Sequence, residues 1–67
     1  MGQKGSELQQ RFRRLGMPLN DFAKECSLST HTIYKVFEER PVRETSVMRV
    51  QNTLDRLEAE MRAAVAG

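Results

Sequence analysis

The polar side chains best suited to bind a ligand gather in one short stretch, residues 29–35. They combine hydroxyl groups, one imidazole and one ammonium group, which can hydrogen-bond an anion or the polar edge of a ring system. The members of this stretch are Ser29, Thr30, His31, Thr32, Tyr34 and Lys35. Arg40 and Arg43 follow closely and add positive charge. These residue types favour recognition of a polar, negatively charged partner.

The sequence offers little for catalysis. It has one cysteine, Cys26, and one histidine, His31, so it can form neither an internal disulfide nor a closed zinc site. It contains no set of nucleophile, base and acid, and no glycine-rich loop that could hold a phosphate. We therefore expect a binding module rather than an enzyme, with no metal or other cofactor. Cys26 is interpreted as a core residue.

The chain is short and its charge is uneven. Its 67 residues allow one domain with a small core. Residues 1–49 carry nine Lys and Arg against six acidic residues, whereas residues 50–67 carry two Arg against three acidic residues. A net charge of +2 suits a polyanionic partner without requiring one. No apolar run is long enough for a membrane helix and no signal peptide follows Met1, so we expect a soluble intracellular protein.

Apolar residues recur at helical spacing in four segments and predict an all-α domain. Ser6 and Gln9 form a capping-box pattern at the start of the first segment, and Gly16 marks its end. Pro18 stands where a second helix, over residues 19–26, would begin. The inward residues expected in these two helices are Leu8, Phe12, Leu15, Leu19, Phe22, Ala23 and Cys26.

The second half of the chain predicts two more helices. Ser29 can cap a third helix over residues 30–37, which must end before Pro41 because a residue that precedes proline is disfavoured in a helix. Thr45 or Ser46 can cap a fourth helix, in which apolar residues recur at steps of three and four. The inward residues expected in the third helix are Ile33, Val36 and Phe37. The apolar row of the fourth helix comprises Val47, Val50, Leu54, Leu57, Met61 and Ala64.

A turn of only three or four residues joins the second and third predicted helices. One arrangement that suits so short a turn is the helix-turn-helix, whose second helix enters the major groove of DNA. It needs a small residue where the two helices cross, and Ala23 is at that place. Ser27 stands in the turn where glycine is usual, so it must adopt a positive φ or the turn must differ.

The segment DFAKECSLSTHTIYKVF resembles the helix-turn-helix of the phage-repressor (Cro-like) and lac-repressor-headpiece superfamily. The matching residues are Ala23, Leu28, Ser29, Thr32, Ile33, Lys35 and Val36. Val42 and the segment VMRVQNTLDRLEAE extend the likeness over residues 18–58. The sequence departs from the family pattern at Ser27 and at Tyr34, where a smaller serine is common. The resemblance implies a four-helix lambda-repressor-like helix-turn-helix domain with an extended C-terminal helix.

The resemblance also implies roles for the polar residues. Thr30 and His31 would reach base edges from the start of the recognition helix, and Lys35, one turn later, would contact a guanine or a phosphate. The residues implied to contact the DNA backbone are Ser29, Thr32, Tyr34, Arg40 and Arg43. For Arg11, Arg13 and Arg14 a DNA contact and a merely solvated helix face both remain open.

We expect a flexible N-terminal arm over residues 1–5, the DNA-binding domain over residues 6–58, and the end of the C-terminal helix over residues 59–67. Two interpretations of that last segment stay open. In one, Val47, Val50 and Leu54 complete the small core, and the rest frays or continues into a domain that is absent from this chain. In the other, Leu57, Met61 and Val65 contact a second copy and form a homodimer.

Together these features favour sequence-specific binding of double-stranded DNA at an operator-like site, by a phage or bacterial transcriptional repressor in the bacterial cytoplasm or nucleoid. A DNA-bending recombination accessory such as an excisionase is one alternative, and bending of the bound site would identify it. A protein-interaction module such as an antitoxin is another, and indifference to DNA at low salt would identify that.

Overall fold

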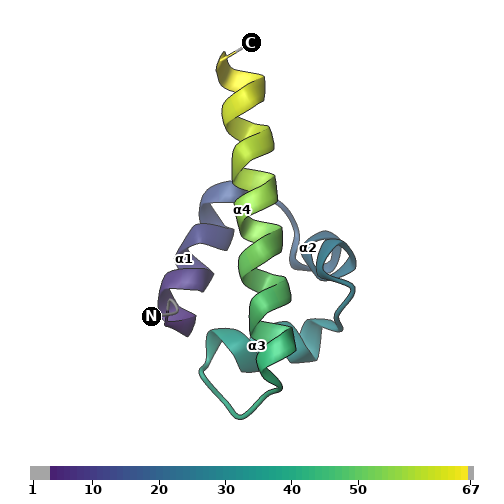
Figure 1. The fold of residues 1–67 in the computed structure, drawn as a ribbon. Coiled ribbons are helices and arrows are strands. Elements are labelled where there is room, and N and C mark those ends of the chain that lie inside the picture. Colours follow the sequence, from purple (N-terminus) through teal and green to yellow (C-terminus); the bar gives the residue numbers. More distant parts are fainter. Residues whose placement is uncertain (1–3, 67) are drawn as a thin grey trace.

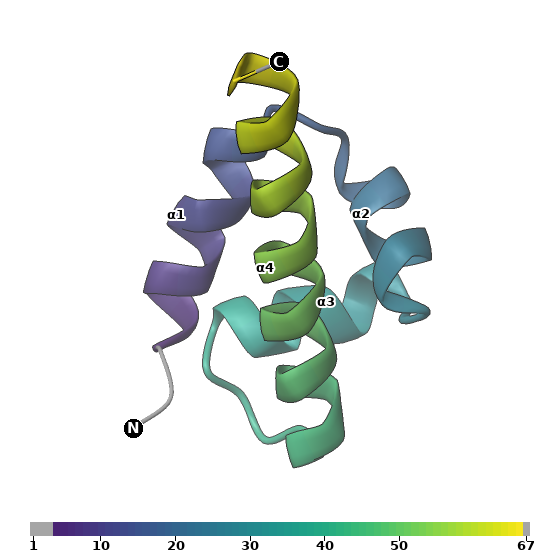
Figure 2. The same cartoon turned by 45° about the horizontal axis from the view of Figure 1, so that its top comes forward.

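The computed structural model describes residues 4–66, and within them every regular element is a helix. Helix α1 spans Gly5–Leu15, α2 Leu19–Cys26, α3 Thr30–Phe37 and α4 Glu44–Ala66. Helix α4 runs through the middle with α1 on one side and α2 on the other, while α3 crosses near the start of α4 (Figures 1 and 2). The prediction of an all-α chain with four helices and an extended last helix is confirmed.

The core lies where the four helices meet. Its most completely buried side chains are Leu8, Phe22, Ile33, Val50 and Leu54. Three phenylalanine rings connect the first three helices, with ring centres 4.9 Å apart for Phe12 and Phe22 and 5.7 Å apart for Phe12 and Phe37. The predicted inward positions of α1, α2 and α3 are buried or partly buried, including Ala23, which is buried where α2 meets the core. In α4 the apolar row is covered from Val47 to Leu57, whereas Met61 and Ala64 of the same row are exposed.

Cys26 is buried in this core, as the sequence predicts. Burial raises the pKa of its thiol, because the thiolate would lose the hydration that stabilises its charge. The side chain of Thr53, also buried, hydrogen-bonds the sulfur and opposes this shift only in part. Cys26 therefore acts as a small apolar side chain.

The turn between α2 and α3 is closed by two backbone hydrogen bonds. The Leu28 amide donates to the Ala23 carbonyl at 3.0 Å, and the Ser27 amide donates to the Lys24 carbonyl at 3.1 Å. This pairing is a Schellman motif, which requires a left-handed residue after the helix. Ser27 is that residue, with φ 57° and ψ 38°. The first of the two conformations expected from the sequence is thus the observed one.

We expect Ser27→Gly to stabilise the protein by about 1 kcal/mol, because glycine adopts a positive φ without the clash that a Cβ causes. The gain is partly offset by the larger entropy of glycine in the unfolded chain. Urea unfolding followed by circular dichroism would measure it. Ser6→Gly is the matched control, because Ser6 lies inside α1 and glycine there should lower stability. Equal losses from both changes would contradict this account of the turn.

The starts of α1 and α4 correct three expectations. Helix α1 begins at Gly5 after Lys4, so Ser6 lies inside the helix and does not cap it. The flexible N-terminal arm predicted over residues 1–5 is therefore wrong at Gly5, which belongs to α1. Met1–Gln3 fall outside the described residues. Helix α4 begins at Glu44, and the carbonyl of Arg43 accepts the Ser46 amide at 3.0 Å, so neither Thr45 nor Ser46 is the cap.

Glu39 adopts a second left-handed conformation that the sequence did not indicate. The Arg40 amide donates to the Lys35 carbonyl at 2.9 Å and the Glu39 amide to the Val36 carbonyl at 3.2 Å, which closes α3 with another Schellman motif. This end of α3 lies against the start of α1. A Cβ on Gly5 would meet the carbonyl oxygens of Val36 and Phe37, so only a hydrogen fits there.

Candidate nucleic-acid interface

Helix α3 buries one face and exposes the other. Ile33, Val36 and Phe37 point into the core, which leaves the opposite face of the same two turns outside. Tyr34 is half exposed and His31 is exposed, whereas Lys35 is partly buried. The outer face of α3 thus carries a basic group, Lys35, and an aromatic group, Tyr34. Packing of the inner face against the core holds the helix in place.

The start of α3 is capped as the sequence predicts. The Thr32 amide donates to Ser29 Oγ at 3.2 Å, and the two hydroxyl oxygens lie 3.0 Å apart. The cap satisfies one of the free amides of the first turn and fixes the entry of the chain into the helix. Ser29 and Thr32 therefore have a structural role, and each hydroxyl keeps hydrogen-bonding capacity for a ligand.

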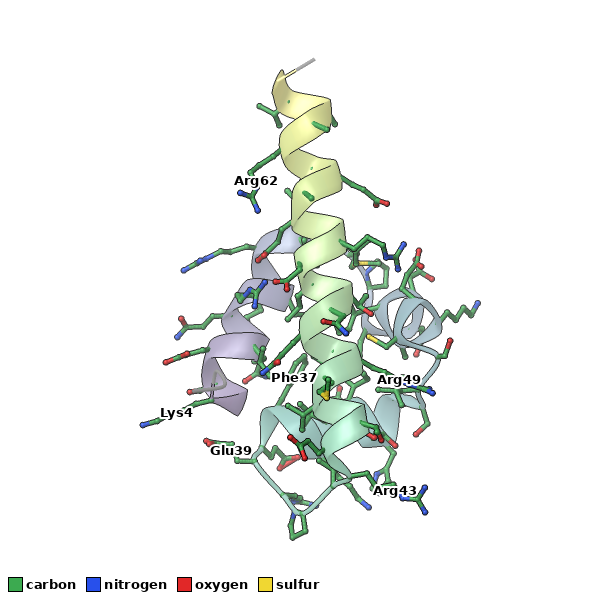
Figure 3. All side chains as sticks on the ribbon, viewed as in Figure 1. Lys4, Phe37, Glu39, Arg43, Arg49 and Arg62 are labelled. Carbon is green, nitrogen blue, oxygen red and sulfur yellow. The ribbon has the colours of Figure 1, made fainter. Side chains whose placement is uncertain are left out.

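The two predicted arginines after α3 differ in their surroundings. Arg40 Nη2 lies 3.2 Å from Glu38 Oε2, and both side chains are exposed. Arg43 is exposed at the start of α4 and extends from the end of the molecule where α3 lies (Figure 3). Arg43 is thus accessible to an anion, whereas Arg40 forms an ion pair with Glu38.

The sequence analysis did not predict two further residues near this face, Arg49 and Glu38. Arg49 of α4 donates from Nη1 to the Ser27 carbonyl at 3.4 Å, so its guanidinium lies beside the α2–α3 turn (Figure 3). Glu38 follows His31 and Lys35 at steps of four and three and therefore continues the outer row of α3. Helical spacing would have found Glu38, but nothing local indicates that Arg49 reaches a turn 22 residues earlier.

The beginning of α3 carries no negatively charged side chain of its own. Residues 26–37 contain no Asp or Glu. Several carboxylates elsewhere are engaged by arginines, with Arg56 Nη2 3.0 Å from Glu25 Oε2 and Arg11 held between Asp55 and Glu58. The first two turns of α3 are consequently a surface on which a polyanion would meet no fixed negative charge from the helix itself.

Arg11 links α1 to α4 and resolves part of the ambiguity of the arginine run. Its Nε lies 2.9 Å from Glu58 Oε2 and its Nη2 lies 2.5 Å from Asp55 Oδ1, with the side chain largely buried. The hydrogen bond from Arg11 lowers the pKa of Glu58, and desolvation opposes this shift. Arg11 therefore stabilises the fold, whereas Arg13 and Arg14 remain exposed on α1.

This ion pair predicts a pH dependence of stability. A carboxylate whose pKa is lowered by folding contributes stability above its ordinary pKa of 4.5, and that stability is lost as the pH falls through the lowered value. We expect about 1 kcal/mol of the stability at neutral pH to depend on it. Unfolding free energies measured from neutral pH down to about pH 3 would show a shallower decline for Glu58→Gln than for the unmodified chain. Parallel curves would contradict the prediction.

No helix within residues 4–66 combines the length and the low charge needed to cross a bilayer. Comparison with known proteins adds no relative, because no protein-family model, curated protein or solved structure matches the chain.

Proposed function

We propose that this chain binds double-stranded DNA in a sequence-specific way, with α2, the three-residue turn and α3 acting as a helix-turn-helix of the lambda-repressor-like type. The observation that carries the proposal is the pairing of a short, rigidly closed turn with an outer face of α3 that is polar and free of carboxylates in its first two turns. Such a face can enter the major groove, which is wide enough to admit a helix.

The roles follow from position on α3. His31 and Lys35 stand one turn apart on the outer face and would donate to guanine N7 or O6, while Thr30 would contact the neighbouring base at the start of the helix. Glu38 lies at the other end of the row and would be repelled by phosphates. The helix would therefore enter the groove with its N-terminal half.

The remaining residues would hold the sugar–phosphate backbone. Arg43 extends freely, Arg40 would exchange Glu38 for a phosphate, and Tyr34 would lie against the backbone beside the groove. The hydroxyls of Ser29 and Thr32 and the free amides at the start of α3 also favour anions. Occupation of an operator by such a domain would block transcription, so a phage or bacterial repressor is the role that we propose.

The direct test is selection of bound sites from random duplex DNA at about 150 mM salt, where charge attraction alone is weak. We expect a recovered motif, and we expect His31→Ala and Lys35→Ala each to weaken binding to it by about 1–3 kcal/mol. Lys24→Ala is the matched control, because Lys24 is exposed on α2 and lies outside the proposed interface. Binding that selects no motif and vanishes with added salt would overturn the proposal.

A further inference from the structure

The last turns of α4 project beyond the other helices of the described residues. Helix α1 ends at Leu15 and α2 begins at Leu19, whereas α4 continues to Ala66 and projects beyond both (Figures 1 and 2). Every residue from Ala59 to Val65 is exposed. This projecting segment contributes nothing to the core that α4 forms farther back, around Val50 and Leu54.

The exposed segment is nevertheless apolar on one side. Met61 is 44% exposed and Val65 86%, and both belong to the small set of large apolar side chains on the surface of the described chain. Leu57, Met61 and Ala64 continue the steps of three and four that Val50 and Leu54 begin inside the core. The apolar row thus runs out of the core into solvent, which is typical of a protein interface.

The surface around Met61 has hollows as well as protruding side chains. On one flank of Met61 lies a hollow of about 380 Å³ lined by Arg14, Leu15, Glu58 and Arg62. On the other lies a hollow of about 280 Å³, lined mainly by apolar side chains of Leu15, Met17, Leu57 and Ala64. A surface that carries both projections and apolar hollows can fit a copy of itself, as a two-fold interface requires.

The charges beside this row also favour a second copy. Arg62 follows Met61 by one residue and Glu60 precedes it, so the two lie on opposite flanks of the row. Two such helices in parallel would bring Arg62 of one copy toward Glu60 of the other. In the antiparallel arrangement about Met61, Arg62 would instead approach Glu58 of the other copy. The parallel pairing sets a cation against an exposed carboxylate, whereas in the antiparallel pairing the carboxylate is already engaged by Arg11 of its own copy.

We infer that the projecting end of α4, with the turn after α1, is the interface of a homodimer of this chain. Leu57, Met61 and Val65 form its apolar centre. A paired helix of about two heptads is too short to be stable alone, so the hollows beside Leu15 supply necessary contact. The inference concerns assembly only and holds or fails independently of DNA binding.

Sedimentation equilibrium of the full chain over a wide concentration range, without DNA, tests the inference. We expect a reversible monomer–dimer equilibrium that Met61→Glu and Val65→Asp each weaken by at least about tenfold, because an unpaired charge would be buried at the centre of the interface. Met48→Glu is the matched control, because Met48 is 51% exposed on α4 and lies outside the row. Circular dichroism should show that all three variants keep the fold.

A chain that stays monomeric at the highest concentration would overturn the inference and leave the face to a different partner. Equal weakening by Met48→Glu and Met61→Glu would also overturn it, because the effect would then follow added charge and not position. Selection of a DNA motif by a monomeric chain would preserve the proposed function while rejecting the dimer, so the two failures are distinguishable.

Discussion

Phe22→Ala should remove a large part of the stability of the protein. Phe22 is fully buried, and its ring centre lies 4.9 Å from that of Phe12 and 6.5 Å from that of Phe37, so the change opens a cavity where three helices meet. Loss of a buried phenylalanine costs about 3–5 kcal/mol. At about 0.05–0.15 kcal/mol per residue, a chain of this length has a total stability of only about 3–10 kcal/mol.

Thermal unfolding followed by circular dichroism measures this effect. Tyr34→Ala provides the control, because Tyr34 is an aromatic residue of similar size with half of its surface in solvent. We expect that variant to unfold within a few degrees of the unmodified chain, since a surface change of this kind alters stability by no more than about 0.5 kcal/mol. A cooperative transition of Phe22→Ala near the original midpoint would mean that the three rings do not form the centre of the core.

Gly5→Ala should destabilise the protein by about 1–3 kcal/mol, although alanine is the better helix former. The reason is the close approach of α1 to the end of α3. A Cβ at residue 5 would stand 2.5 Å from the Phe37 carbonyl oxygen and would also meet that of Val36, and backbone oxygens at a closed helix end cannot move aside as a flexible side chain does. One helix must shift away from the other.

Urea unfolding of Gly5→Ala and Ser6→Ala separates this contact from helix propensity. Ser6 is the next residue of α1 and is exposed, so alanine there should leave stability unchanged or raise it slightly. If both variants were equally stable or more stable than the unmodified chain, the close contact between α1 and α3 would be refuted. The position matters for the proposed interface, since α3 carries the residues that would contact DNA.

The sequence predicts the middle of the molecule better than its edges. Apolar periodicity with Ser29 as cap defines α3 from Thr30 to Phe37, and a positive φ at Ser27 is one of the two conformations that the sequence allows for the turn. Ser6 and Thr45 fail as caps because each has polar neighbours that could begin the same helix, and packing decides among them. Glu39 has no intrinsic preference for a left-handed backbone, so only the closure of α3 before Pro41 places it there.

The candidate site, too, could be predicted from the sequence only in part. Which side chains of α3 face outward follows from helical spacing once Ile33 and Val36 are placed inside. The contacts of Arg11 and Arg49 do not follow, because partners such as Glu58 for Arg11 lie on distant parts of the chain and come within reach only in the folded state. The sequence alone therefore does not show whether an arginine binds a ligand or forms an ion pair with another helix.

The pairing of α1 with α4 also constrains how the chain can fold as it is synthesised. Arg11 and Glu58 are 47 residues apart, and Val50 and Leu54 of α4 complete the core that Leu8 enters from α1. A ribosome makes about 5–20 residues each second, whereas helical domains with mostly local contacts fold in microseconds to milliseconds. The first three helices must therefore wait, incompletely packed, until most of α4 has emerged. Folding is then fast relative to elongation, so the emergence of α4 sets the moment at which the surface of α3 becomes ordered.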